Sequence, residues 1–202
     1  AVILAFVGDR KIAPAINILG SAATFVASIF LALEVYTNGP MITASGYFFV
    51  DAFNVYLSVL TAFVSMTTAI FSRRYMRRER EKGKVGRAGM RFYHAMFQLF
   101  IFAMLLALLT NNVGILWISM ELATLSTVLL VSLYRTPPAV EAAWKYFILC
   151  GVGIAQALFG TVLLYFAADR VFGAGSAALL WSHLSQSADK LDPTVHSLAV
   201  VF

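Results

Sequence analysis

The sequence predicts an all-α protein, a polytopic bundle of transmembrane helices. Only 12% of its 202 residues are charged and 60% are hydrophobic, whereas roughly a quarter of the residues in soluble domains are charged. Several stretches of about 20 residues contain no Asp, Glu, Lys or Arg, which is the length that a helix needs to cross a bilayer core of about 30 Å. These stretches do not alternate polar and apolar residues, which disfavours a membrane β-barrel.

The apolar stretches predict five complete spans and two partial ones. We expect helices over 12–36, 49–72, 92–110, 113–134 and 144–168. Residues 1–7 and 196–202 are apolar fragments at the two ends, and we expect them to be partial spans. The chain is therefore expected to be a piece of a longer protein.

Charge predicts the orientation of the bundle. The segment 73–91 carries nine Lys or Arg and two Glu. A basic run can indicate nucleic-acid binding, but this one is a short loop between two spans, so we expect no nucleic-acid partner. The positive-inside rule places the loop in the cytoplasm, together with Arg10, Lys11 and Arg135. The polar segment 169–195 lies on the other side and could hold a short surface helix around 176–184, with Trp181 at the interface.

One acid, Glu121, interrupts the span 113–134. An ionised acid at mid-bilayer costs about 2.5–3.5 kcal/mol on insertion scales, so it must face protein or water. Desolvation favours the neutral acid and a nearby cation favours the carboxylate, and an acid between these influences can bind and release a proton. The alternative is a neutral acid bonded to the backbone or to Thr124, one turn on.

Lys145, at the start of the sixth predicted span, is a second candidate for proton transfer. The alternative is a lysine that extends its amine to the membrane interface. Glu121 lies 13 residues before Tyr134, roughly 20 Å along a straight helix. Because Lys145 is expected near the membrane surface, we predict no direct contact between the two.

Three further polar side chains could line a hydrated path towards Glu121. His94 and Gln98 are four residues apart, on one face of a helix, and Gln156 follows Lys145 by three helical turns. The alternative is that these groups form hydrogen bonds between packed helices. One histidine and scattered amides do not make a metal site, and we predict none. With a single cysteine, Cys150, and no glycine fingerprint, we expect no cofactor site for flavin, iron–sulfur or nickel in this chain.

Long segments resemble the antiporter-like subunits of respiratory complex I, membrane-bound hydrogenases and Mrp-type sodium/proton antiporters. The segment NNVGILWISMELATLSTVLLVSLYRTPPAVEAAWKYFILCGVGIAQALFGTVLLYFAA (111–168) is similar to their fifth and sixth helices. YFFVDAFNVYLSVLTAFV with FSRRYM resembles their third helix, including Asp51. FYHAMFQLF together with EAAWKYFIL is most similar to the hydrogenase-four type component F, of the formate hydrogenlyase class.

The resemblance implies the N-terminal portion of an inverted-repeat, proton-translocating membrane subunit. It implies that Glu121 is the key acid, that Lys145 matches the sixth-helix lysine, and that a lysine partner on a broken seventh helix lies beyond Phe202. It also implies a bacterial or archaeal cytoplasmic membrane, and partner subunits, membrane and peripheral, of an NADH:quinone oxidoreductase-like or hydrogenase complex. Iron–sulfur clusters, flavin or a NiFe centre are expected in those partners. The alternatives are a secondary cation/proton antiporter or bicarbonate-uptake partner without redox coupling, and a scaffold for a peripheral enzyme.

Overall fold

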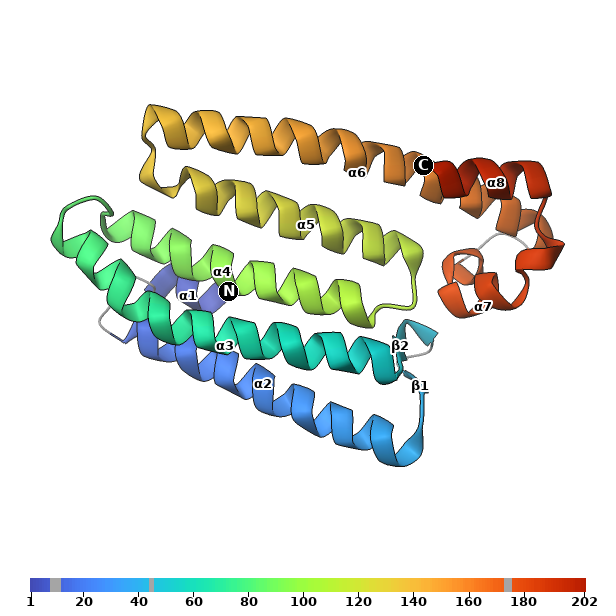
Figure 1. Cartoon of the computed structure of the whole chain (residues 1–202), viewed down its shortest axis with the longest axis horizontal. Helices are drawn as coiled ribbons and strands as arrows, with labels where there is room; N and C mark the ends of the chain where they lie inside the picture. The colour runs from blue at the N-terminus through green and yellow to red at the C-terminus, as the bar shows by residue number, and fades with distance from the viewer. Residues whose placement is uncertain (8–11, 44–45, 173–175) are drawn as a thin grey trace.

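The computed structural model describes residues 1–7, 12–43, 46–172 and 176–202. It is an elongated helical bundle with a short hairpin and small helices at one end (Figure 1). The elements in order are α1 (Val2–Val7), α2 (Ala13–Asn38), β1 (Met41–Thr43), β2 (Phe48–Val50), α3 (Ala52–Glu81), α4 (Arg87–Leu109), α5 (Val113–Val131), η2 (Ser132–Tyr134), α6 (Pro137–Phe172), η3 (Ser176–Leu179), α7 (Trp181–Gln186), η4 (Ala188–Lys190) and α8 (Pro193–Val201). Arg10 and Lys11, which we assigned to a cytoplasmic connection, lie outside the described residues.

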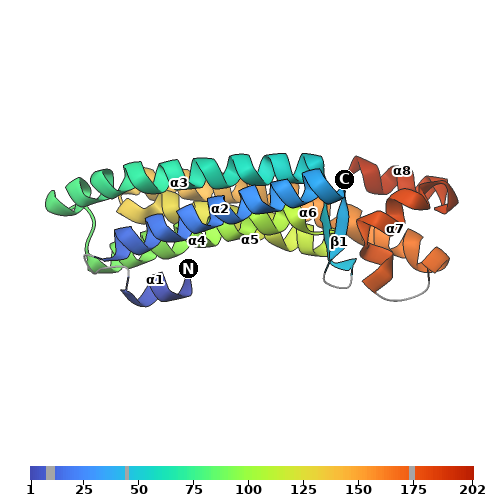
Figure 2. The ribbon, with the colours of Figure 1, turned by 90° about the horizontal axis from the view of Figure 1, so that it is seen from below.

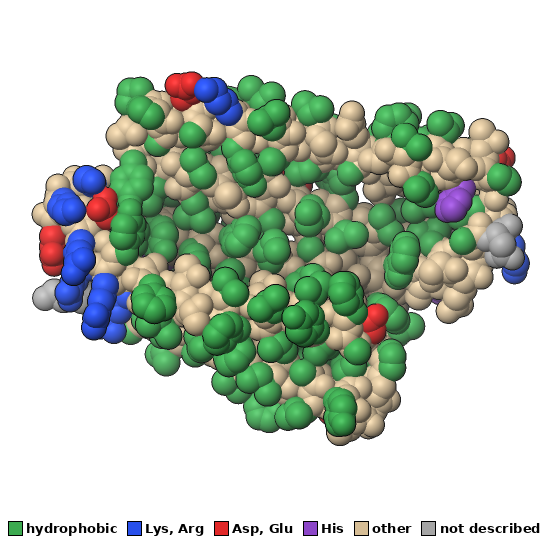
Figure 3. Space-filling view, in the orientation of Figure 1, with side chains coloured by type: hydrophobic (Ala, Val, Ile, Leu, Met, Phe, Trp, Pro, Cys, Tyr) green, Lys and Arg blue, Asp and Glu red, His purple; other side chains and the backbone are tan. Residues whose placement is uncertain are grey.

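Five of the described helices, α2 to α6, are long and apolar enough to cross a membrane, which confirms the predicted all-α transmembrane bundle. They lie side by side in chain order (Figure 1). The short helix α1 packs against α4 and α2 (Figure 2). We call the end of the bundle that holds the α3–α4 and α5–α6 turns the basic end, and the opposite end, which holds β1 and β2, the hairpin end. Figure 3 shows Lys and Arg side chains gathered at the basic end.

Small residues let the helices pack closely. On α3 the buried positions recur every three or four residues and are mostly small: Val55, Ser58, Ala62, Ser65 and Ala69. Small side chains at this spacing allow the backbones of neighbouring helices to approach. The closest neighbour of this face is α2, which buries Asn17, Ser21 and Ser28.

The basic segment 73–91 is mostly helix, which corrects the expected loop. α3 continues to Glu81 and α4 begins at Arg87, so only 82–86 form the turn, with Gly83 at a φ of 73°. Hydropathy detects contact with lipid rather than helix formation, and Arg, Lys, Glu and Met all favour helix in water. Met76 also packs with Val85 and Met90 and so holds this helical extension against α4.

The sixth span begins at Pro137, seven residues before the predicted start at 144, and runs to Phe172. Thr136 caps it: the Ala139 amide donates to Thr136 Oγ1 at 3.4 Å. Proline fits the first turn of a helix because the amide there needs no partner within the helix. The segment RTPP therefore ends one helix and begins the next.

Asn111 joins the elements at the hairpin end. It is 1% exposed, and its side-chain amide donates to Gly46 O at 2.7 Å and to Ser182 Oγ at 2.9 Å. Its carbonyl oxygen Oδ1 accepts from the Ser182 amide at 3.0 Å. The next residue, Asn112, caps α5 by accepting from the Ile115 amide at 3.1 Å. The pair Asn111-Asn112, part of the family resemblance, is thus structural.

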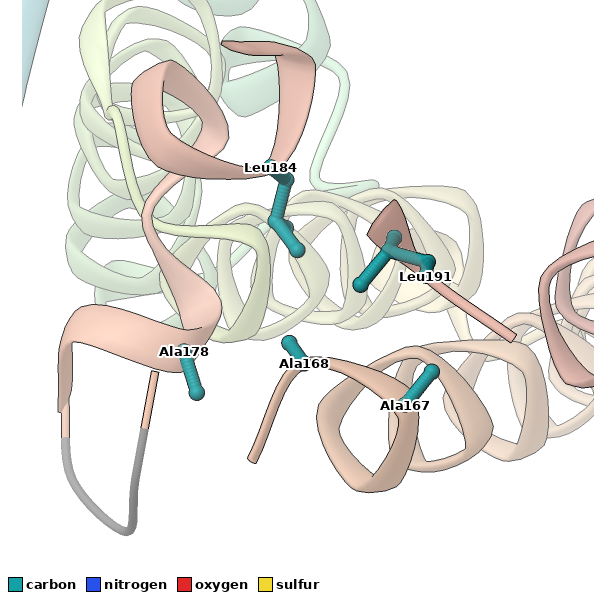
Figure 4. Packing of buried hydrophobic residues seen from close by; sticks show 5 residues of the cluster. All are labelled: Ala167, Ala168, Ala178, Leu184 and Leu191. Carbon is teal, nitrogen blue, oxygen red and sulfur yellow. The ribbon is translucent and has the colours of Figure 1, made fainter. Parts of the chain in front are cut away.

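The segment that follows α6 packs on the last turns of that helix. The short helix α7 lies where the sequence predicted one, and Trp181 at its start is 55% exposed. The buried cluster beneath it is shown in Figure 4 and consists of Ala167, Ala168, Ala178, Leu184 and Leu191. The apolar C-terminal fragment is part of α8, which begins at Pro193 and packs along α6.

Candidate functional site

Glu121 lies near the middle of α5 and faces α6. Its neighbour one turn earlier, Trp117, donates its indole N–H to the Ile154 carbonyl of α6 at 2.8 Å. Residues four apart share a helix face, so Glu121 also lies on the side of α5 that meets α6. The side chain is half-buried in this chain.

The Glu121 carboxylate forms no hydrogen bond or ion pair with any other described residue. The alternative partner Thr124 does not bond to it, because the Thr124 hydroxyl donates to the Met120 carbonyl at 3.0 Å. Ser119 and Ser126, on the same helix, likewise donate to carbonyls one turn back. The hydroxyls of α5 therefore satisfy the backbone and leave the acid without a partner in the described chain.

Lys145 lies on the far side of α6 from α5. Its amine pairs with Glu141, one turn earlier, and the two side chains are 71% and 64% exposed. Ala143 and Phe147 face α5, since they line an apolar cavity of about 380 Å³ with residues of that helix such as Leu125. Lys145 is two residues from each of them, and a shift of two residues turns the helix by about 200°.

The early start of α6 changes the depth of Lys145. Lys145 is eight residues after Pro137, about 12 Å along the helix. Glu121 is about 20 Å from Tyr134 by the same measure, so the two differ in depth by only about 8 Å. They are separated chiefly because they lie on opposite sides of α6, and no bond joins them in the described chain.

Gln156 follows Lys145 by eleven residues, three turns on nearly the same helix face. It is exposed in this chain, as Lys145 is. Lys145 and Gln156 therefore form a polar stripe on the outer side of α6. Glu141 lies on the same side one turn before Lys145, and Leu149 and Val152, between Lys145 and Gln156, are exposed apolar residues.

Gln98 belongs to a separate polar cluster between α2, α3 and α4. Its amide nitrogen donates to Asn17 Oδ1 at 2.8 Å and to Ser21 Oγ at 3.0 Å, both on α2. Ser65 Oγ of α3 donates to Ser21 Oγ at 3.4 Å. This cluster faces away from α6 and does not reach Glu121.

His94 lies one turn from Gln98 towards the basic end. It is 1% exposed, and neither ring nitrogen has a hydrogen-bond partner among the described residues. It lines a cavity of about 590 Å³ with Arg73, Arg77 and Arg80 of α3 and Pro14 of α2. Of the five predicted site residues, His94 and Gln98 thus lie one turn apart on α4, and Lys145 and Gln156 lie three turns apart on one face of α6. Glu121 lies on α5 and is bonded to none of them in the described chain.

The hydrogen-bond partners of two of these residues were not predicted from the sequence. Glu141, the partner of Lys145, could have been found from its spacing of four residues. Asn17 and Ser21, the partners of Gln98, are polar residues within an apolar span, 81 and 77 residues away. Their positions inside an apolar span could have indicated that they bond to polar residues of other helices, since polar groups inside a span need protein partners.

Known proteins resemble the whole chain. No protein-family model matches the sequence. The chain is 44% identical over 200 residues to the "Hydrogenase-4 component F homolog" of Methylacidiphilum infernorum, covering 99% of this chain and 41% of that protein. It is 31% identical over 169 residues to "NADH-quinone oxidoreductase subunit N" of Thiobacillus denitrificans, covering 81% of this chain and 32% of that protein.

A solved structure has the same fold. The chain aligns with part of the membrane-bound sulfane sulfur reductase, an archaeal respiratory membrane complex, with a TM-score of 0.79 and 21% identity. The alignment covers 98% of this chain and 40% of the other. The chain therefore spans less than half the length of these relatives. The predicted resemblance is confirmed: the chain is similar to part of a hydrogenase-4 component F homolog and to part of subunit N of NADH-quinone oxidoreductase.

Proposed function

We propose that this chain is part of a proton-translocating membrane subunit of a redox-driven complex. The complex is of the NADH:quinone oxidoreductase or membrane-bound hydrogenase type, which the names of the relatives support. Electrons move in partner subunits that carry iron–sulfur clusters, flavin or a NiFe centre. The contribution of this chain is to hold and release a proton within the membrane.

The observation that carries the proposal is Glu121, a carboxylate in the middle of a span without a partner in the described chain. Such a group is stabilised either by taking up a proton or by water and a cation from outside this chain. It lies between α5 and α6, the helices that carry the longest family resemblance. When Glu121 can either take up a proton or be stabilised as a carboxylate by water and a cation, its two protonation states are close in free energy. A proton carrier needs two states of similar free energy.

Lys145 and Gln156 act from the outer side of α6 in this proposal. Their stripe faces either lipid or further protein, and an exposed lysine about 12 Å into a helix is costly against lipid. We propose that the stripe faces another part of the same subunit or a neighbouring membrane subunit. The amine of Lys145 then exchanges Glu141 for an acid of that neighbour as protons move. A proton path through His94 and Gln98 stays a prediction. In this chain these two residues face α2 and α3 rather than Glu121.

The test is Glu121→Gln in the assembled complex, in inside-out membrane vesicles supplied with the electron donor. Proton uptake, followed by quenching of a pH-sensitive dye, should be largely lost, while the complex still assembles. The matched control is Glu34→Gln, since Glu34 is an exposed carboxylate near the end of α2 that bonds only to Asn38. Proton uptake that survives Glu121→Gln would leave the chain a scaffold. Uptake that needs no electron donor would indicate a secondary antiporter.

A further inference from the structure

We propose that the cavity between α2, α3 and α4 at the basic end binds the phosphate of an anionic phospholipid. Arg73 and Arg77 of α3 and His94 of α4 line it, and its volume is about 590 Å³. This inference does not depend on whether the chain moves protons.

The first argument is the charge of the cavity. Arg73, Arg77 and Arg80 line it, and Glu81 is the one acid among the described residues that line it. Glu81 lies 3.6 Å from Arg77 in a pair whose side chains are 66% and 73% exposed, and such a pair is weak and can open. A positive cavity lowers the local concentration of protons and raises that of anions. The cavity is therefore better suited to an anion than to the entry of protons.

The second argument is His94, which is buried and without a hydrogen-bond partner. The side chain is 1% exposed and lines the cavity, and neither of its ring nitrogens has a hydrogen-bond partner among the described residues. A buried polar group without a partner costs about 1–3 kcal/mol, so an occupant that accepts a hydrogen bond stabilises this position. Phosphate oxygens accept from imidazole and from the guanidinium fork of arginine.

The third argument is depth, which favours a lipid over a soluble anion. Arg73 is the first charged residue after the uncharged stretch of α3, and His94 lies three residues inside Arg91 on α4, about 4.5 Å along the helix. The cavity therefore lies where the apolar spans meet the charged end of the bundle, at the level of lipid headgroups. Pro14, Met76 and Met90 supply apolar walls, and the exposed side chain of Ile70 lies one turn from Arg73 towards the membrane centre.

The experiment compares two pairs of substitutions in the assembled complex. Arg73→Gln/Arg77→Gln removes two charges from the cavity. Arg74→Gln/Arg78→Gln removes two charges at the same spacing from the same helix, and neither Arg74 nor Arg78 lines the cavity. Native mass spectrometry of the delipidated complex, with phosphatidylglycerol or phosphatidylcholine added back, reports how many lipids are retained and how tightly.

We expect the cavity pair to bind phosphatidylglycerol at least about tenfold more weakly than the wild type, because two charge-assisted hydrogen bonds are lost. The control pair should bind it as the wild type does, and binding of phosphatidylcholine should not depend on either pair. His94→Phe should also weaken phosphatidylglycerol binding; if this variant does not fold, the arginine pairs decide. Equal loss in both pairs would overturn the proposal.

A further arm separates the lipid from a soluble anion. Inorganic phosphate is added to the delipidated complex in place of lipid. Binding of phosphate that depends on Arg73 and Arg77, without binding of phosphatidylglycerol, would overturn the proposal in favour of a soluble anion. Retention of phosphatidylglycerol in the presence of excess phosphate supports the lipid.

Discussion

Gln98, on the α2–α4 side of the bundle, differs from the candidate residues on the α5–α6 side in whether other helices of the chain supply its hydrogen-bond partners. Among α2, α3 and α4, Gln98 bonds to Asn17 and Ser21 within the chain. On α5 and α6, Glu121 and Gln156 have no such partner among the described residues, and Lys145 pairs only within its own helix. Burial is greatest on α3, where 33% of the most apolar stretch is buried, and least on α6, where 6% is buried, while α2 and α5 are equal at 17%. Polar groups at membrane depth need partners, so the α5–α6 side is where we expect neighbouring protein and proton transfer to meet.

The largest effect on stability is expected at Asn111, which joins the two sides at the hairpin end. Asn111→Ala removes three side-chain hydrogen bonds and leaves the Gly46 carbonyl and the Ser182 amide without these partners. The free energy of unfolding should fall by about 2–3 kcal/mol. Thermal unfolding in detergent, followed by circular dichroism, measures it. Asn112→Ala is the control and loses only a helix cap, worth about 1 kcal/mol; equal effects would mean that Asn111 does not join the two sides.

A matched pair of glutamines tests the comparison directly. Gln98→Leu leaves the buried Asn17 side chain without its donor and Ser21 with Ser65 alone, which should lower the free energy of unfolding by about 1–2 kcal/mol. Gln156→Leu breaks no bond within the described chain and should leave stability nearly unchanged, while reducing proton uptake by the complex. The same unfolding and dye measurements serve both variants. The comparison fails if Gln156→Leu destabilises the chain as much as Gln98→Leu does.

Substitutions at two glycines of α6 compare a position that is packed against another helix with a position that is open. A methyl group added at Gly160 would lie 2.8 Å from the Ala199 carbonyl oxygen of α8, whereas one added at Gly151 would meet no described atom within 4 Å apart from the neighbouring backbone of its own helix. Gly160→Ala should therefore displace α8 and cost about 1 kcal/mol. Gly151→Ala should stabilise the isolated chain by up to about 1 kcal/mol through helix propensity. Loss of assembly in Gly151→Ala would show that a neighbouring subunit packs closely at that position.

The spans could be predicted from the sequence because hydropathy reports contact with lipid. Helix ends could not, wherever a helix continues into water. The extension of α3 through Arg73–Glu81 is charged but helical, and α6 begins with two prolines that fit its first turn. In both places the local residues favour helix while the hydropathy signal has ended.

The candidate site residues could be selected one by one from the sequence, but their arrangement in space could not. Glu121 and Lys145 stand out because charge is costly within a span. Which face each residue occupies depends on helix phase and on contacts such as Trp117 with Ile154. The partners of Gln98 lie on a helix that is distant in sequence, so packing was needed to find them. The path towards Glu121 stays a prediction, and its residues occupy separate places within this chain.

The smallest effect on stability is expected for the pair Glu141 and Lys145. An exposed ion pair four residues apart on a helix contributes about 0.3–0.5 kcal/mol, so Glu141→Gln should change the unfolding temperature of the isolated chain very little. In the complex, Lys145→Gln should reduce proton uptake more than Glu141→Gln does, because we propose that the amine leaves Glu141 for an acid of the neighbour. Salt provides a check, since added salt should weaken the exposed pair in the isolated chain and have less effect where the complex covers it. Equal uptake in the two variants would mean that the pair acts as a unit and that the outer stripe of α6 does not exchange partners.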